Sequence, residues 1–211
     1  MLEIYEEMRY NIQTIKDYDC SGQKIFLLNT EVIMAQNESA YIKNNEADIR
    51  IISLPTLPRS PEQLRSLPCF DILDPFKTAA CAVAALCEYG HDTEASVAMI
   101  NMLKGSDQLS EHDKHFLSDR FAGGKDYIPR SYLGGAAPDN GYTPSEPITV
   151  TVSELPDSRR EAGYIDMYVT SGGADAPRPV RLRQKPSTGE WFLWSFSALL
   201  SGIRVPRQRL D

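Results

Sequence analysis

The chain has 211 residues, of which 42% are hydrophobic and 24% are charged, and its formal net charge is −7. These proportions are typical of globular proteins and argue against a chain that is disordered throughout. The acidic balance argues against a general nucleic-acid-binding protein, which needs a basic surface. No segment is long and apolar enough to cross a membrane, and residues 1–19 carry acids where a signal peptide carries basic residues. We therefore expect a cytoplasmic protein.

The first 68 residues are predicted to form an N-terminal extension. Residues 2–16 have the apolar spacing of a helix. An apolar patch within 24–34 (residues 25–28, then 32–34) and a short apolar run at 49–54 are each compatible with a strand, although neither is long enough to decide. The polar segment 36–48 lies between them. Four prolines between residues 55 and 68 predict an irregular linker, because proline lacks a backbone N–H and fixes φ. We place the boundary with the core domain near Leu67.

The stretch from Asp74 to Gly90 predicts a buried helix around which the rest of the chain is arranged. The Asp74 carboxylate can accept hydrogen bonds from the first turn, and Pro75 suits the first helical position. Residues 79–87 are almost all apolar, and a helix that is apolar on every side is a buried helix. Small side chains would let neighbouring elements approach closely; these are Ala79, Ala80, Ala82 and Ala84.

Two further helices are predicted after the central one. Asp92 or Thr93 is expected to cap the first of them, which ends at Gly105. Ser110 is expected to open the second, with Asp113 in the position of a capping-box partner. Short connections predict that consecutive helices pack as neighbours.

The remainder of the chain is predicted to be a loop followed by strands. Residues 127–147 are rich in tyrosine, proline and glycine and predict a long ordered loop, or alternatively a mobile linker. Residues 148–153, 164–170, 180–183 and 191–196 have the patterns of four strands. Helices followed by a run of strands indicate an α+β fold with an antiparallel sheet. We expect residues 69–206 to form one domain, in which three helices pack against a sheet or half-barrel of about four strands, with residues 207–211 as a tail.

Several stretches of this core resemble a bacterial family known as a domain of unknown function. They are DPFKTAACAVAALCEY (74–89), LKGSDQLSEHDKHFLSDR (103–120), DYIPRSYLGGAAPDNGYTPSEP (126–147), SGGADAPRPVRLR (171–183) and EWFLWSFSALLSGIR (190–204). The resemblance covers most of residues 69–206 and none of the first 68. It implies a fold unit and no mechanism.

A metal site is the first candidate for chemistry. His112 and His115 lie three residues apart and would share a helix face, and Asp119 could supply a third ligand. The HExxH pattern is absent, however, and the surrounding charged residues are typical of a solvated helix face. We predict two exposed histidines, and neither a metal nor another cofactor.

Catalytic motifs do not emerge from the sequence. It has no GxSxG elbow, although a triad assembled only in three dimensions stays open. Its glycine pairs match neither GxxxxGK[ST] nor GxGxxG and are expected to be turns. The four cysteines, Cys20, Cys69, Cys81 and Cys87, lack CxxC spacing and are expected to be buried thiols. Cys81 and Cys87 are about 9 Å apart in helical rise, too far for a disulfide.

The C-terminal quarter carries a strip of basic residues. From 178 to 209 there are seven of them and one acid, whereas residues 69–175 hold 17 acids and eight basic residues. Arg181 and Arg183 are expected on the opposite sheet face from the buried strand residues. One interpretation is a surface for an acidic protein partner or a phosphorylated ligand. The other is internal complementarity, with the acidic helices lying across the basic strand.

The leading functional expectation is a protein-interaction or scaffolding module without catalytic activity. Its candidate partner-binding residues are Arg178, Arg181, Arg183, Tyr132 and Tyr142. The loop 136–147 would supply a tyrosine contact, or would instead pack on its own sheet edge. The alternative function is an enzyme or small-molecule binder with a pocket between the sheet and the helices. No oligomeric state is predicted.

Overall fold

The computed structural model of the protein describes residues 32–35, 39–43 and 47–207. The helix predicted for residues 2–16, the apolar run at 25–28 and the last four residues of the predicted tail lie outside this part of the chain.

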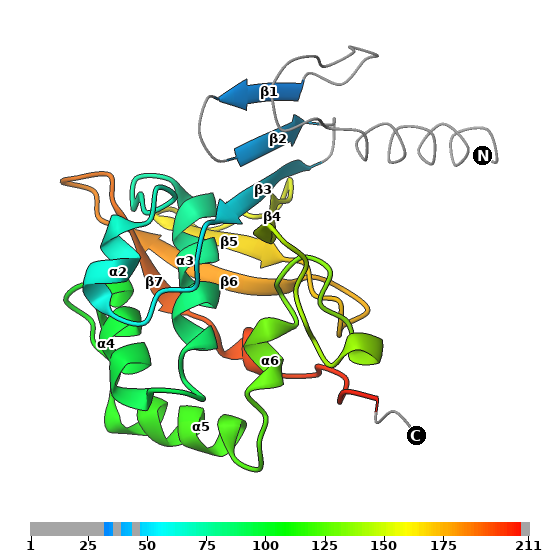
Figure 1. The fold of residues 1–211 in the computed structure, drawn as a ribbon. Helices are drawn as coiled ribbons and strands as arrows, with labels where there is room; N and C mark the ends of the chain where they lie inside the picture. Colours follow the sequence, from blue (N-terminus) through cyan, green and yellow to red (C-terminus); the bar gives the residue numbers. More distant parts are fainter. Residues whose placement is uncertain (1–31, 36–38, 44–46, 208–211) are drawn as a thin grey trace, which may run out of the picture. The chain divides into compact units, whose positions relative to one another are not determined.

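Within the described residues, seven antiparallel strands form one sheet, and each strand pairs with the next one along the chain (Figure 1). The strands are β1 (Val32–Ala35), β2 (Ser39–Lys43), β3 (Asp48–Leu54), β4 (Ile148–Glu154), β5 (Tyr164–Val169), β6 (Arg178–Gln184) and β7 (Trp191–Ser195). The four strands predicted after residue 147 are confirmed as β4 to β7, and with them the α+β class. The sheet is larger than the predicted four strands because β1, β2 and β3 extend it beyond β4.

The additional strands arise from segments placed in the predicted extension. β3 corresponds to the apolar run at 49–54, and it pairs with β4 along its whole length, from Asp48 opposite Glu154 to Leu54 opposite Ile148. Ile52 and Leu54 are fully buried. β2 falls in the polar segment 36–48, where no strand was predicted, because five residues between polar neighbours give too short a pattern.

The predicted linker at 55–68 contains a helix, α2 (Pro61–Ser66). The Ser60 hydroxyl accepts a hydrogen bond from the Gln63 N–H at 3.3 Å, and Pro61 occupies the first turn, where its missing N–H costs no hydrogen bond. Leu64 is fully buried in the core. The expectation of irregular structure was therefore wrong here, since Pro61 starts a helix instead of breaking one. Residues on both sides of the boundary predicted near Leu67 contribute to the same core.

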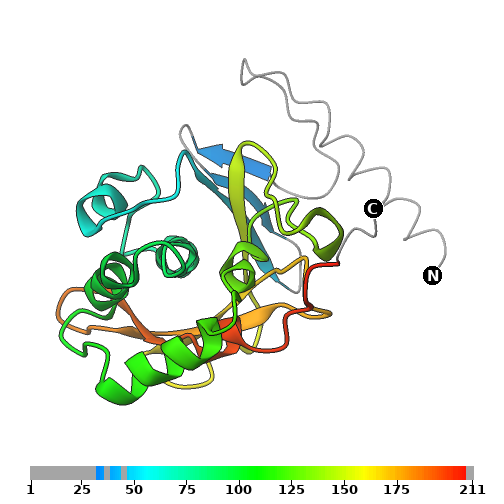
Figure 2. The same cartoon turned by 60° about the horizontal axis from the view of Figure 1, so that its bottom comes forward.

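The central helix is α3 (Pro75–Cys87), as predicted. The Asp74 side chain accepts from the Phe76 N–H at 2.9 Å. All residues from Thr78 to Cys87 are buried. The helix contacts five strands, β3 to β7, and Figure 2 shows it between these strands and the helices α2 and α4. None of the helices in the described residues is long and apolar enough to span a membrane.

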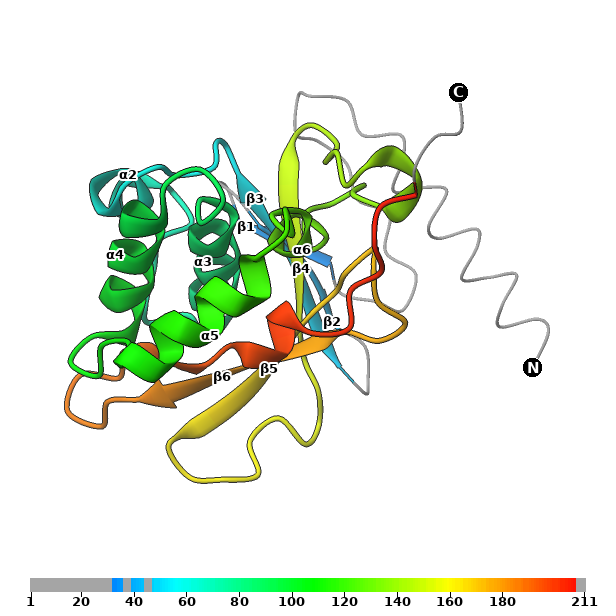
Figure 3. The same cartoon turned by 90° about the horizontal axis from the view of Figure 1, so that it is seen from below.

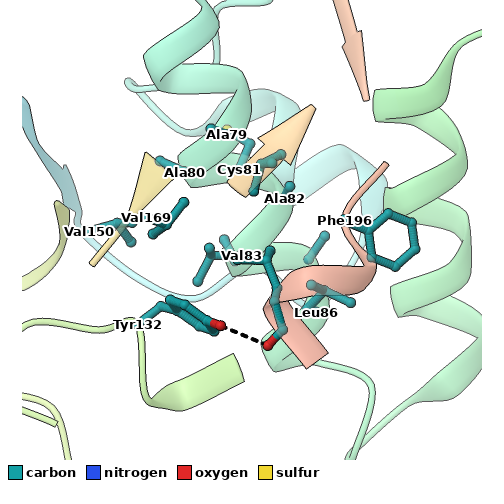
Figure 4. Close-up of a cluster of buried hydrophobic side chains, with 14 of the residues drawn as sticks. Ala79, Ala80, Cys81, Ala82, Val83, Leu86, Tyr132, Val150, Val169 and Phe196 are labelled. Carbon is teal, nitrogen blue, oxygen red and sulfur yellow. Dashed lines mark hydrogen bonds between the residues drawn. The ribbon is translucent and has the colours of Figure 1, made fainter. Parts of the chain in front are cut away.

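The alanines of α3 face the interior of the protein, as their spacing predicts. Ala80 is fully buried, and Figure 4 shows it beside Val150 of β4 and Val169 of β5. Val83, on the next turn, lies close to Tyr132 in the same view. Side chains this small allow the helix backbone to approach the sheet closely, which larger residues would prevent.

Arg50 of β3 connects the sheet to the start of α3. Its Nη1 donates to Asp74 Oδ2 at 3.0 Å, and its guanidinium carbon lies 3.9 Å from the centroid of the Phe76 ring. Oδ1 of the same carboxylate accepts the hydrogen bond that caps the helix. The Asp74 carboxylate therefore both caps the N-terminus of α3 and forms an ion pair with Arg50 of β3.

Two longer helices follow, α4 (Thr93–Lys104) and α5 (Glu111–Phe121). The Asp92 carboxylate accepts from the Ala95 N–H at 2.9 Å, so Asp92 is the N-cap. Ser110 and Asp113 form the predicted capping box, in which each side chain accepts a hydrogen bond from the backbone N–H of the other. Burial acts to raise the pKa of Asp113, but the hydrogen bonds from Ser110 together with the charges of Lys104 and His112 leave it below its usual value.

The segment between α5 and β4 combines exposed residues with a buried part, which includes Tyr127, Ile128, Tyr132, Leu133 and Tyr142. It contains a short helix, α6 (Tyr127–Arg130), and a 3-10 turn, η1 (Pro138–Asn140). Leu133 bridges to Val150 of β4. A second 3-10 turn, η2 (Ser197–Leu200), follows β7, and the chain after it runs beside η1 (Figure 3). There the Arg207 N–H donates to the Pro138 carbonyl at 2.9 Å.

A small-to-large substitution tests the packing of α3. Ala80→Leu should lower the free energy of unfolding by about 1–3 kcal/mol, because the added atoms have no space between the helix and the sheet. Urea denaturation measures the change. Ala98→Leu is a matched control at an exposed position of α4 and should change stability by less than about 0.5 kcal/mol. Equal effects of the two substitutions would show that α3 is not tightly packed.

Candidate partner-binding surface

A β-bulge between β6 and β7 exposes Trp194. The register pairs Leu182 with Leu193 and Arg181 with Ser195, so β7 has one residue more than β6 at this step. Trp194 is that extra residue, and it is 42% exposed. Bulges re-aim side chains and are frequent beside functional sites. An exposed tryptophan at such a position is therefore a candidate for recognition.

Tyr164 and two arginines surround Trp194. The Tyr164 ring meets the indole edge-on, with centroids 5.7 Å apart and an interplanar angle of 72°. The guanidinium carbon of Arg183 lies 4.6 Å from the centroid of the Trp194 ring, and that of Arg181 lies 4.9 Å from the centroid of the Tyr164 ring. All four side chains lie on the sheet face opposite the core. We call these four residues the Arg–aromatic surface.

Acidic side chains from neighbouring loops and strands pair with the two arginines of this surface. Arg183 Nη2 donates to Asp107, which lies in the connection after α4. Arg181 Nη2 donates to Glu161 in the connection before β5, and Asp166 of β5 lies 3.9 Å from its Nη1. All three pairs are partly exposed to solvent, where an ion pair adds little stability.

The remaining arginines of the basic strip that the structure describes also have partners. Arg178 Nη2 donates to the Gly202 carbonyl at 3.1 Å. Arg204 pairs with Asp175, and Arg207 Nη1 lies 3.0 Å from Asp139. These contacts agree with the interpretation of internal complementarity. The acidic partners were expected on helices that lie across the strand. They lie instead in turns, in loops and on a neighbouring strand.

Tyr132 and Tyr142 are interior residues and do not belong to an exposed surface. They are 2% and 1% exposed, and their hydroxyls donate to the carbonyls of Leu199 at 2.8 Å and Arg204 at 2.6 Å. Figure 4 shows the Tyr132 hydrogen bond. Burial raises the pKa of both phenols, so they act as neutral donors. The expectation that they contact a partner is not met, because the loop that carries them packs on its own protein.

The metal candidates lie on the solvated side of α5. His112, His115 and Asp119 are all exposed. Among the described residues, no group of three or more histidine, cysteine or acidic side chains is arranged to hold a metal ion. The two histidines are therefore part of a polar helix face, as the neighbouring charges indicated.

Several buried polar side chains form internal hydrogen bonds. The Ser96 hydroxyl donates to the Ala85 carbonyl at 2.8 Å and links α4 to α3. The Ser171 hydroxyl donates to that of Ser131 at 2.8 Å, and the Thr78 hydroxyl donates to the Asp74 carbonyl at 3.0 Å. These bonds satisfy groups that would otherwise be costly to bury. These hydroxyls therefore have structural roles. A ligand pocket between the sheet and the helices would instead need polar groups that point toward a ligand.

The sequence pattern indicates the two arginines of the Arg–aromatic surface but not its two aromatic residues. Tyr164 appeared only as the polar side of a strand pattern. Trp194 was part of the continuous apolar run 191–196, which does not reveal the face on which each residue lies. A bulge shifts the alternation by one residue, and nothing in the sequence marked its position.

The Tyr132 hydroxyl provides a test of the buried loop. Tyr132→Phe should lower the free energy of unfolding by about 0.5–1.5 kcal/mol, because the Leu199 carbonyl loses its donor. The pKa of Tyr132 is raised in the folded state, so its contribution is complete below the unfolded pKa of about 10 and declines at higher pH. Urea denaturation at pH 7 and above pH 10 measures both effects. Wild-type stability at pH 7 in the variant would contradict a buried, bonded hydroxyl.

A double-mutant cycle tests the ion pair of Arg183 and Asp107. Arg183→Ala, Asp107→Ala and the double variant should give a coupling energy of about 0.2–1 kcal/mol, as is usual for exposed pairs. Chemical denaturation of the four proteins measures it. A coupling of several kcal/mol would instead make the pair a main structural contact of the fold.

Comparison with known proteins identifies a family and no closer relative. Searches of curated proteins and of solved structures gave no match. Residues 56–207 match a family described as Domain of unknown function (DUF6935). The match includes α2 to α6 and β4 to β7, and therefore the Arg–aromatic surface. Because it spans more than half of the chain, the protein belongs to the DUF6935 family.

Proposed function

We propose that the protein is a non-catalytic interaction module that binds a protein partner through the Arg–aromatic surface. The single observation that carries the proposal is the bulge-exposed Trp194, which stands beside Tyr164 and Arg183 on the outer face of the sheet. Tryptophan, tyrosine and arginine are the residues most enriched at the energetic centres of protein interfaces. All three types meet at this one place.

The packing of the cluster suits it to recognition. Trp194 contacts the Tyr164 ring edge-to-face and also has the Arg183 guanidinium over its ring. A side chain that is already ordered loses little conformational entropy when a partner covers it. The β-sheet beneath adds rigidity, since Arg183 is paired in register with both Tyr164 and Phe192.

The partner is proposed to bring an acidic or phosphorylated side chain to Arg183. Asp107 now occupies that guanidinium from an exposed loop, so it acts as an internal competitor. A partner carboxylate or phosphate would replace it, and bidentate pairs of this kind add specificity as well as energy. We also propose that the protein is bacterial and works in the cytoplasm. The resemblance noted above supports the first, and three buried cysteines in the thiol form support the second.

A photo-crosslinking experiment tests this surface. A benzophenone amino acid at position 195, next to Trp194 and exposed, is expected to give a discrete covalent adduct with one protein in cells that express the chain. Adding Trp194→Ala to the same chain should abolish the adduct, because the central contact of the interface is lost. Electrophoresis and mass spectrometry measure the adduct.

Two controls make the result specific. Val205→Ala alters another exposed apolar residue, outside the Arg–aromatic surface, and should leave the adduct unchanged. Asp107→Ala should increase it, because it removes the internal competitor of Arg183. An adduct that survives Trp194→Ala, or the absence of any adduct, would refute the proposed surface. Thermal midpoints of all variants show whether each remains folded.

A further inference from the structure

The chain after η2 forms a strap, residues 202–207, which has no regular secondary structure and runs beside η1 (Figure 3). Two arginines of the strap lie three residues apart, and each is bound through both its backbone and its side chain. The Arg204 N–H donates to the Gly173 carbonyl at 2.9 Å, and the Arg204 guanidinium donates to the Asp175 carboxylate. The Tyr142 hydroxyl donates to the Arg204 carbonyl at 2.6 Å. Arg204 is therefore held at three points.

Arg207 repeats this arrangement farther along the strap. Its N–H donates to the Pro138 carbonyl at 2.9 Å, and its Nη1 lies 3.0 Å from Oδ1 of Asp139. The contacts to the two arginines come from five residues, which we call the strap surface: Pro138, Asp139, Tyr142, Gly173 and Asp175. A backbone hydrogen bond accepts almost any residue, whereas a carboxylate beside it selects a basic side chain. The strap surface therefore fits a segment with arginines three residues apart.

The strap surface is held in shape by contacts that do not involve the strap. Tyr142 is buried, and its ring stacks on that of Tyr127 with centroids 5.5 Å apart. Its φ of 58° lies in the left-handed region, which a bulky residue adopts only where the surroundings determine it. The Asn140 side chain accepts from the Ala137 N–H and donates to the Gly135 carbonyl, both at 2.9 Å. The loop that binds Arg207 is therefore organised independently of its occupant.

The glycine pair at 172–173 allows the strap to approach this closely. A Cβ atom at Gly173 would collide with the Tyr142 hydroxyl and would lie 2.8 Å from Cγ2 of Ile203 in the strap. A Cβ atom at Gly172 would collide with the Ala136 carbonyl. Only glycine therefore fits at either position. The sequence marked this pair as a turn, and the structure shows that it also makes room for the strap.

The strap itself is held mainly by exposed groups. The side chains of Arg204 and Arg207 are 50% and 78% exposed, and ion pairs at such positions add little stability. Val205 is also exposed, and Ile203 is only partly buried. A tethered segment needs no strong contacts, because its effective concentration at its own site is on the order of mM. An organised surface with a weakly held occupant is suited to exchange of that occupant.

We propose that the strap surface is a second binding site, which takes an arginine-containing segment of a partner protein, and that the strap is its internal occupant. The partner segment carries two arginines three residues apart, as the sequence RVPR at 204–207 does. Its arginines pair with Asp175 and Asp139. Its backbone N–H groups bind the Gly173 and Pro138 carbonyls. The partner segment displaces the strap, because both need the same groups. None of these groups belongs to the Arg–aromatic surface.

A fluorescent peptide with the sequence of the strap, SGIRVPR (residues 201–207) with blocked ends, tests the site. It is titrated at low salt into the full-length chain that carries Arg204→Ala and Arg207→Ala. We expect it to bind this variant at least about tenfold more tightly than the wild type, because the internal competitor is weakened. The peptide SGIRVRP has the same composition with arginines two apart, and it should bind at least about tenfold more weakly than SGIRVPR. Fluorescence anisotropy measures both.

Further variants assign the binding to the strap surface. Adding Asp139→Ala and Asp175→Ala should weaken peptide binding at least about tenfold and remove its dependence on salt. Adding Asp119→Ala, at another exposed acid, should leave binding unchanged. Thermal midpoints show whether each variant is folded, and Arg207→Ala alone replaces the double arginine variant if that is unfolded. Equal binding of the two peptides, equal binding to wild type and strap variant, or no binding up to about 1 mM peptide would overturn the proposal.

Discussion

The close approach of α3 to the sheet is the constraint on which the rest of the structure depends. The helix contacts strands β3 to β7 on one side and α4 and α6 on others, and it does so with fully buried alanines at its centre. Each neighbour is positioned by contact with this one backbone. A larger side chain at any of these positions would displace several elements together, because a close-packed interior transmits strain.

The features that the sequence predicted best are those with local causes. The caps of α3 and α5, the buried alanine helix and the alternating strands β4 to β6 all depend on residues within one turn or one strand. The misses depend on contacts between distant segments. The four prolines of residues 55–68 predict an irregular linker, and only the burial of Leu64 shows that the short helix α2 is packed. For Tyr132 and Tyr142 the sequence left a partner contact and a self-packed loop as alternatives, because their acceptors, at Leu199 and Arg204, lie more than 60 residues away in the chain.

The candidate surface shows the same division. Arg181 and Arg183 were placed on the correct face by simple alternation, but their acidic partners lie earlier in the chain, in two loops and in β5. Each arginine is at once a charged surface group, the partner of a carboxylate and the cover of an aromatic ring. In the isolated protein, internal carboxylates neutralise the charges of the two arginines. The selectivity of the proposed surface would therefore arise from replacement of an internal carboxylate by one of the partner, and from the shape of the surface around Trp194.

The double role of Asp74 has a consequence for how the chain can be divided. Its carboxylate caps α3 and also binds Arg50, so the start of the helix and the placement of β3 stabilise one another. The family match begins at residue 56, after β3 has ended. A fragment cut at that boundary would keep the helix cap but lose the guanidinium that neutralises it. It would also turn β4 from an inner strand into an unpaired edge, open to pairing with another chain. The smallest self-sufficient unit of this protein is therefore expected to begin before β3, upstream of the residues that match the family.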